Sequence, residues 1–90
     1  MTVQVLLPRL LSDCTGGRTS MTVDLPASGT VCALLDVLAA DHPVFDRRVR
    51  DETGALRRHV NVYVDRERAG LETALRPDSR VDVISAISGG

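Results

Sequence analysis

The stretch HVNVYVD, residues 59–65, alternates apolar and polar side chains more strictly than any other part of the chain. Asn61 and Tyr63 fall on one face of an extended segment, and the opposite face carries only valines. The period of two predicts a strand that buries its valine face. The valines of that face are Val60, Val62 and Val64. The same alternation returns in RVDVI, residues 80–84, which predicts another strand close to the end of the chain.

Two further strands are predicted near the start of the chain. Residues 2–8 alternate, with valine or leucine at every odd position from 3 to 7, and SMTVDLP, residues 20–26, alternates in the same way. SDCTGGR, residues 12–18, separates the two segments and contains Gly16 and Gly17, which readily adopt the positive φ of a hairpin turn. The segment therefore predicts a turn between two neighbouring strands.

The period changes to that of a helix in TVCALLDVLAADHP, residues 30–43. One stripe of this segment is apolar with spacing i, i+3, i+4 and i+7, namely Val31, Leu34, Leu35 and Leu38. Thr30 is a good N-cap, and the step from His42 to Pro43 predicts the far boundary. Residues 44–58 are polar and rich in arginine, with a turn expected at DETG, residues 51–54. A loop or short helical turn is expected in residues 70–79.

The predicted order of elements is strand, strand, helix, strand, strand. We therefore expect an α+β fold in which one main helix packs across one face of a sheet. Residues 1–90 contain no linker or repeat, so they predict a single domain that ends in a flexible tail, residues 85–90. Periodicity alone does not determine how the first pair of strands meets the second pair.

The composition excludes several classes of function. Of the 90 residues, 43% are hydrophobic, which favours a folded core. Only Phe45 and Tyr63 are aromatic, which argues against a function that depends on stacking of nucleic-acid bases. The net charge of −1 gives no dominant field, and all eleven basic residues are arginine. The absence of lysine excludes an enzyme with a Schiff-base lysine or a Walker lysine.

The remaining polar and reactive residues have structural interpretations. Cys14 and Cys32 lie outside any CxxC or metal-ligand spacing and are expected to fill small spaces in the core. His42 and His59 lack a neighbouring nucleophile or ligand, so no catalytic site or metal site is predicted. A group of five arginines is interleaved with carboxylates and is interpreted as a solvated charged face. Its members are Arg47, Arg48, Arg50, Arg57 and Arg58. The sequence shows no signal peptide or membrane span, which favours the cytoplasm.

These features together resemble the β-grasp, ubiquitin-like sulfur carriers, which include the small subunit of molybdopterin synthase and the thiazole-biosynthesis carrier. The resemblance rests on the order of elements, HVNVYVD, the approach GLETALRPDSRVDVI and the terminal Gly89-Gly90. VLLPRLLSDCTGG and LRRHVNVYVDRE are most similar to the carrier of the actinobacterial cysteine-biosynthesis route. The chain departs from such carriers at Ser85, where proline is usual, and at Asp65, where asparagine is usual. For the fold, the resemblance implies that the first and last strands pair in parallel at the centre of the sheet.

For the function, the resemblance implies chemistry at the Gly90 carboxylate. A ubiquitin-activating-type enzyme would adenylate it with ATP and Mg²⁺, and a sulfur donor would convert the adenylate to a thiocarboxylate. The carrier would be a protein cosubstrate without a stably bound cofactor. Glycine suits this role because it lacks a Cβ and leaves the tail thin enough to enter a partner's pocket. The tail residues expected to contact partners are Ala86, Ile87, Ser88 and Gly89.

Leu6, Tyr63 and Ile84 are expected on the face of the sheet opposite the helix. We interpret them as a docking patch for the activating enzyme and for a sulfur-accepting synthase. The favoured acceptor is a cysteine-synthase-like enzyme. Three other acceptors are also compatible with the sequence, namely molybdopterin synthase, a thiazole synthase and the synthase of a thio-containing metabolite.

We expect the carrier to be a monomer when it is not bound to a partner. The alternatives are a ubiquitin-like modifier joined to target proteins through Gly90, and a β-grasp binding module with an idle tail.

Overall fold

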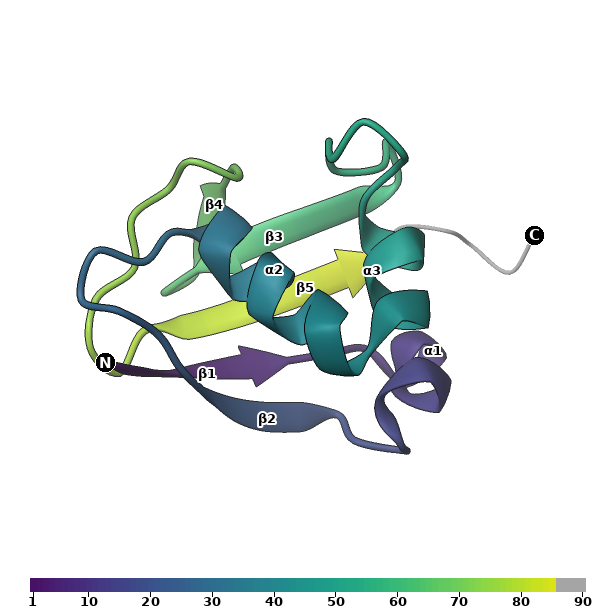
Figure 1. Ribbon diagram of the computed structural model, residues 1–90, viewed down its shortest axis with the longest axis horizontal. Helices are drawn as coiled ribbons and strands as arrows, with labels where there is room; N and C mark the ends of the chain where they lie inside the picture. The colour runs from purple at the N-terminus through teal and green to yellow at the C-terminus, as the bar shows by residue number, and fades with distance from the viewer. Residues whose placement is uncertain (86–90) are drawn as a thin grey trace.

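Five strands form one mixed sheet in the computed structural model, which describes residues 1–85 (Figure 1). The spatial order is β2-β1-β5-β3-β4. The strands are β1 (Thr2–Leu6), β2 (Ser20–Asp24), β3 (Val60–Val64), β4 (Glu67–Ala69) and β5 (Arg80–Ser85). The helices are α1 (Arg9–Ser12), α2 (Val31–Asp41) and α3 (Pro43–Val49), with a short 3-10 turn, η1 (Asp13–Thr15). The expectation of an α+β fold with a main helix across one face is confirmed.

The two strands at the ends of the chain pair in parallel at the centre of the sheet. Val5 of β1 lies beside Val81 of β5, and both side chains are fully buried. β5 also pairs antiparallel with β3, where Val62 lies beside Val83. This arrangement confirms what the resemblance implied about the strand order.

Valines and leucines of the sheet pack against α2 to form the core. Thr30 caps α2, since its hydroxyl oxygen accepts a hydrogen bond of 3.2 Å from the backbone N–H of Ala33. The predicted apolar stripe is buried throughout, with Leu34 and Leu35 at most 1% exposed. Figure 1 shows α2 lying across the sheet, with α3 beside it. The spacing of apolar residues thus predicted both the helix and the face that it covers.

The connection from β1 to β2 is more structured than the predicted turn. Gly16 and Gly17 do have the positive φ that the sequence predicted, at 68° and 83°. Before them, however, the chain forms α1 and η1, which bury Leu11 and Thr15. The Thr15 hydroxyl bonds the carbonyl oxygens of Ser12 and Arg18, at 3.1 and 2.8 Å. These contacts fold the segment back before β2 begins.

A further helix, α3, overlaps the arginine-rich segment, residues 44–58, in which the sequence predicted only a turn. Pro43 occupies its first turn, where the missing N–H costs nothing, and Phe45 and Val49 bury their side chains completely. The expected turn at residues 51–54 follows α3, with Gly54 at φ 88°. Helix α3 therefore contributes buried side chains to the core directly after α2, where the sequence predicted only that the main helix would end.

The last two strands also differ in detail from the prediction. The three-residue strand β4 pairs with β3 at the sheet edge and was not predicted. β5 runs one residue beyond the predicted strand, because Ser85 pairs with Val60. The tail expected to start at residue 85 therefore starts no earlier than residue 86. Within residues 1–85, no helix is long and apolar enough to cross a membrane.

Candidate functional site

The expected reactive end of the chain begins where β5 ends. Ala86, Ile87, Ser88, Gly89 and Gly90 lie outside the described residues, so their predicted roles are not placed by the structure. Ser85, the last described residue, lies at the end of the sheet near α1 and α3 (Figure 1). The surface around the end of β5 is therefore the part of the described structure that directly precedes the predicted reactive residues in the chain.

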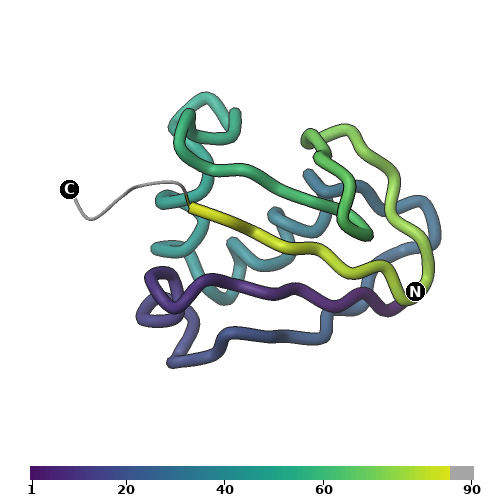
Figure 2. Tube along the Cα trace, turned by 180° about the vertical axis from the view of Figure 1, so that it is seen from behind, coloured from purple at the N-terminus to yellow at the C-terminus, as the bar shows by residue number. Residues whose placement is uncertain are grey.

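The three residues of the docking patch share the face of the sheet opposite α2, as the alternation predicted. The valines that precede them in the sequence, Val5, Val62 and Val83, are buried, whereas Leu6 and Tyr63 are half-buried and Ile84 is 44% exposed. Figure 2, which is turned by 180° from Figure 1, looks directly onto this open face, with the strands in front of the helices. The prediction that Leu6, Tyr63 and Ile84 share one face agrees with the structure.

The patch is not continuously apolar, however. On β5, Asp82 lies directly beside Leu6 of β1 and directly beside Tyr63 of β3. Tyr63 in turn lies beside Arg68 of β4. A single row across the open face thus reads leucine, aspartate, tyrosine and arginine, with Ile84 two residues farther along β5. The sequence reasoning missed Asp82 and Arg68 because it considered only apolar residues, although the alternation of RVDVI already places Asp82 on the open face.

Asp82 is held in an ion pair on this face. Arg80 Nε and Asp82 Oδ2 are 3.1 Å apart, and a second contact of 3.3 Å joins Arg80 Nη2 to Asp82 Oδ1. Nearby, a carboxylate oxygen of Asp65 accepts a hydrogen bond of 2.9 Å from the backbone N–H of Arg80. Asp65 itself adopts a positive φ of 49° in the turn after β3. The departure from asparagine at position 65 therefore supplies a charged acceptor that fixes the start of β5.

The two helices at the end of the sheet where β5 stops each carry an exposed apolar side chain. Leu10 of α1 is 55% exposed and Val44 of α3 is 43% exposed, values similar to that of Ile84. Both helices lie at this end in Figure 1. The sequence did not single out Leu10 and Val44, because residues 9–11 were assigned to no element and residues 44–58 were predicted to be a polar segment.

The prediction that the five arginines form a solvated charged face is wrong for one of them, Arg50. Arg50 is buried, and its guanidinium lies 2.8 Å from Asp36 and 2.7 Å from Asp46. Burial lowers the pKa of Arg50, but the hydrogen bonds to the two carboxylates outweigh this and raise it above its ordinary value. Arg50 is thus a permanently charged tie between α2 and the end of α3.

The two cysteines have different surroundings. Cys14 packs against the hydrophobic core, as expected, whereas Cys32 lies outside that cluster. The Cys32 sulfur is 3.8 Å from Nη1 of Arg50, so the expectation that it fills a space in the core is wrong. Both cysteines are free thiols. Within residues 1–85, no three His, Cys, Asp or Glu side chains come together in a way that could hold a metal ion.

The comparisons with known proteins agree on one family. The model of the ThiS family matches residues 5–90. The sulfur carrier protein CysO of Mycobacterium tuberculosis is 35% identical to this chain, over 100% of both chains. The small archaeal modifier protein 1 of Haloferax volcanii is 34% identical over 89% of this chain and 91% of its own length.

Solved structures give the same result. The crystal structure of the Haloferax volcanii SAMP1 matches this chain with a TM-score of 0.89 and 29% identity, over 100% of both chains. A chain of the BexX/CysO complex of Amycolatopsis orientalis matches with a TM-score of 0.76 and 30% identity, over 98% of this chain and 99% of its own. The relatives are carrier and modifier proteins, so the expectation that the chain is not an enzyme is confirmed.

Proposed function

Because the chain belongs to the ThiS family, we propose that it is a sulfur carrier whose Gly90 carboxylate is activated and converted to a thiocarboxylate. The observation that carries the proposal is the full-length likeness to the sulfur carrier protein CysO at 35% identity. The family match extends to Gly90, so it includes the glycine on which the chemistry depends. The open sheet face beside the end of β5 supports the proposal by offering a docking surface.

The proposed reaction has two steps before sulfur transfer. The Gly90 carboxylate attacks the α-phosphorus of ATP, with Mg²⁺ held by the activating enzyme, and pyrophosphate leaves. A sulfide-level donor then attacks the acyl carbon, the bond to AMP breaks, and the thiocarboxylate remains. A side chain at position 90 would crowd the attacked carbon, whereas glycine leaves it open. The carrier contributes a substrate, and the catalytic groups belong to its partners.

The docking patch gives these partners a common surface. Leu6, Tyr63 and Ile84 supply apolar contact, and the charged row through Asp82 and Arg68 supplies a fixed arrangement of charge. Charged residues at an interface determine the choice of partner and the association rate more than the affinity. We therefore assign the patch to the ubiquitin-activating-type adenylyltransferase and to the sulfur-accepting synthase, which bind it in turn.

The favoured acceptor condenses the thiocarboxylate with an activated serine derivative to make cysteine. The support is the likeness to the sulfur carrier protein CysO of Mycobacterium tuberculosis. Molybdopterin, thiamin or a thio-containing metabolite would use the same thiocarboxylate with a different synthase. The acceptor enzyme therefore determines the pathway, and the carrier chemistry is the same in each case.

A second candidate function is that of a protein modifier joined to targets through Gly90. The observation that favours it is the likeness to small archaeal modifier protein 1, in sequence and in structure. Adenylation is the first step of both functions. Conjugates on other proteins that disappear when Gly90 is deleted would favour the modifier over the carrier.

The docking patch is tested by the kinetics of adenylation. Tyr63→Glu puts a second carboxylate beside Asp82. Ile84→Glu puts a charge beside the end of β5. We expect each change to lower kcat/KM of ATP–pyrophosphate exchange by about tenfold or more, because desolvated charge without a partner opposes docking. Gln4→Glu is the matched control, since Gln4 is exposed on the same face but farther from the end of β5. Unchanged exchange kinetics in folded Tyr63→Glu and Ile84→Glu variants would show that the activating enzyme does not dock on this patch.

A further inference from the structure

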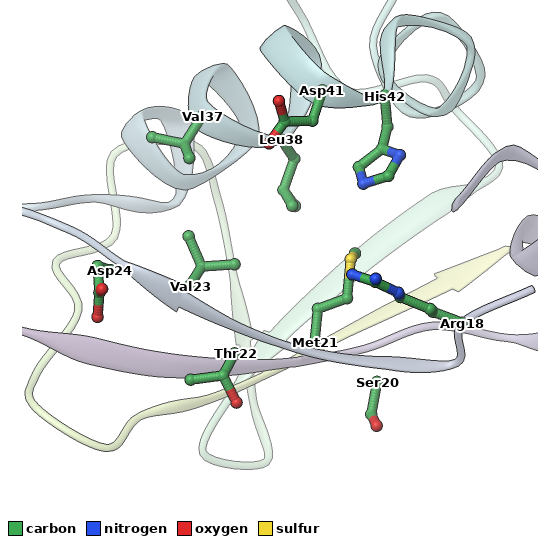
Figure 3. A pocket seen from close by; sticks show the side chains of 10 residues that line it. All are labelled: Arg18, Ser20, Met21, Thr22, Val23, Asp24, Val37, Leu38, Asp41 and His42. Carbon is green, nitrogen blue, oxygen red and sulfur yellow. The ribbon is translucent and has the colours of Figure 1, made fainter. Parts of the chain in front are cut away.

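A groove runs between the edge strand β2 and helix α2, on the side of the molecule away from β4. Met21 and Val23 of β2 and Val37 and Leu38 of α2 form its apolar part (Figure 3). Val37 is 39% exposed and Met21 is half-buried, so both offer apolar surface to a ligand. This groove lies at the β2 edge of the sheet, and β1 separates it from β5.

The backbone of β2 is free to pair along this groove. In the β1–β2 ladder, Leu25 N–H donates to the Met1 carbonyl at 2.7 Å, and Leu7 N–H donates to the Thr19 carbonyl at 2.8 Å. These bonds and the register show that the odd residues of β2 bond to β1. The N–H and C=O groups of the even residues therefore point outward, away from the sheet. They belong to Ser20, Thr22 and Asp24, all of which are exposed.

The strand has little of the usual protection of an edge. Natural edge strands are often blocked by charged side chains, proline or a bulge. Strand β2 contains no proline or bulge, its one charged residue is Asp24 at its end, and it pairs with β1 in regular register along its whole length. A strand added to β2 would place its side chains opposite Met21 and Val23 on the groove side, in non-hydrogen-bonded pairs with closely spaced side chains. The groove would thus receive two apolar side chains that are two residues apart.

The charges around the groove differ along its length. Arg18 and His42 lie at one end, and Figure 3 shows the Arg18 guanidinium pointing toward Met21. Among residues 1–85, Arg18 forms no ion pair. Asp41 and Asp24 border the rest of the groove. A carboxylate on the ligand is therefore favoured at the Arg18 end and disfavoured elsewhere.

We infer that the β2 groove binds an extended peptide segment of a partner protein, which adds to the sheet as a further strand. The segment carries two aliphatic side chains at alternate positions and a carboxylate at the Arg18 end. Main-chain hydrogen bonds to Ser20, Thr22 and Asp24 supply affinity, and the side chains supply specificity. The described residues that line the groove all lie between positions 18 and 42, and we expect a partner to occupy the groove during sulfur transfer.

Synthetic peptides test the inference directly. The probe has two valines separated by threonine, with glutamate two positions beyond one valine, and a second probe has the reversed sequence. Nuclear magnetic resonance titration is expected to show saturable shifts of the Ser20, Thr22 and Asp24 amides. Arg18→Glu is expected to weaken binding about fivefold, and a probe with lysine in place of glutamate is expected to recover it.

Two further variants separate backbone pairing from the groove surface. Thr22→Pro removes an outward N–H that the β1–β2 ladder does not use, and it is expected to weaken binding roughly tenfold, whereas Thr22→Val keeps the N–H and binds normally. Val37→Glu places a charge on the helix side without touching any strand and is also expected to weaken binding. Deletion of Gly90 is expected to leave binding unchanged.

Three results would overturn the inference. The first is the absence of saturable shifts along β2 with either probe. The second is a set of shifts centred on Gln4, Tyr63 and Arg80, which would place the peptide on the open face. The third is self-association of the protein through β2 as its own concentration rises, which would make a second copy of the chain the occupant.

Discussion

Single residues explain how a short chain holds its less regular half in place. Arg50 joins α2 to the end of α3 through two carboxylates, and Asp51 organises the turn that follows. Both residues come from the segment in which the sequence predicted only a charged surface and a turn. Their roles depend on partners in other elements, so composition and spacing did not indicate that Arg50 is buried.

Replacing Arg50 with alanine is expected to lower the free energy of unfolding by about 2 kcal/mol, since it removes a buried partner from two carboxylates. Urea unfolding followed by circular dichroism measures the change. Arg48→Ala is the control, because Arg48 is exposed on the same helix and forms no ion pair within residues 1–85. Equal stability of the two variants would show that the buried tie does not stabilise the fold.

Asp51 gives the fold a dependence on pH. Hydrogen bonds from the Thr53 hydroxyl and backbone N–H, and from the Ala55 N–H, hold the pKa of Asp51 below its usual value of 3.8. A pKa that is lower in the folded state contributes stability above the unfolded pKa and loses it as the pH falls through the folded pKa. Asp51→Asn should therefore be less stable than the natural chain at neutral pH, and the difference should shrink below pH 3.8. Urea midpoints across this range measure it, and a constant difference would contradict the assignment.

At the scale of elements, alternation along β1, β3 and β5 separates the core from the open face of the sheet. Val83 of β5 is 2% exposed and Ile84 beside it is 44% exposed, although the two differ by one methylene. This alternation was predicted from RVDVI. The apolar stripe of α2 and its N-cap, Thr30, were also predicted, from residues 30–43. The short elements were not. Four residues of α1 and three of β4 are too few to show a period, and their positions depend on contacts with distant parts of the chain.

Helix α3 could have been recognised from its sequence. Pro43 is typical of a first helical turn, and Phe45 and Val49 have the i, i+4 spacing of a buried face. The many arginines around them masked this signal. The β2 groove could not have been predicted in the same way, because it combines residues of β2 with the end of α2, and only the fold brings them together.

Paired alanine substitutions in β5 test the separation of the two faces. Val83→Ala is expected to lower the free energy of unfolding by about 2 kcal/mol through the cavity that it leaves, and Ile84→Ala by less than about 1 kcal/mol. Ile84→Ala is expected instead to slow adenylation. Chemical denaturation and pyrophosphate exchange, measured on both variants, distinguish these effects. The reverse order of stability would mean that the assigned faces of β5 are exchanged.

At the scale of the whole molecule, the fold presents distinct surfaces for distinct tasks. The open face and the end of β5 are assigned to activation and sulfur transfer, whereas the β2 groove lies between the edge strand β2 and helix α2 (Figures 1 and 3). The helices cover the other face and complete the core.

Intact-mass spectrometry of the protein, co-expressed with the activating enzyme and sulfur source of its native host, tests the central claim most directly. We predict that a fraction of the protein gains the mass difference between one sulfur and one oxygen, and that fragmentation places this change on Gly90. Deletion of Gly90 is predicted to abolish the change, while Ile84→Glu is predicted to reduce it. An unchanged mass under active adenylation, or a mass gain that survives deletion of Gly90, would contradict the account.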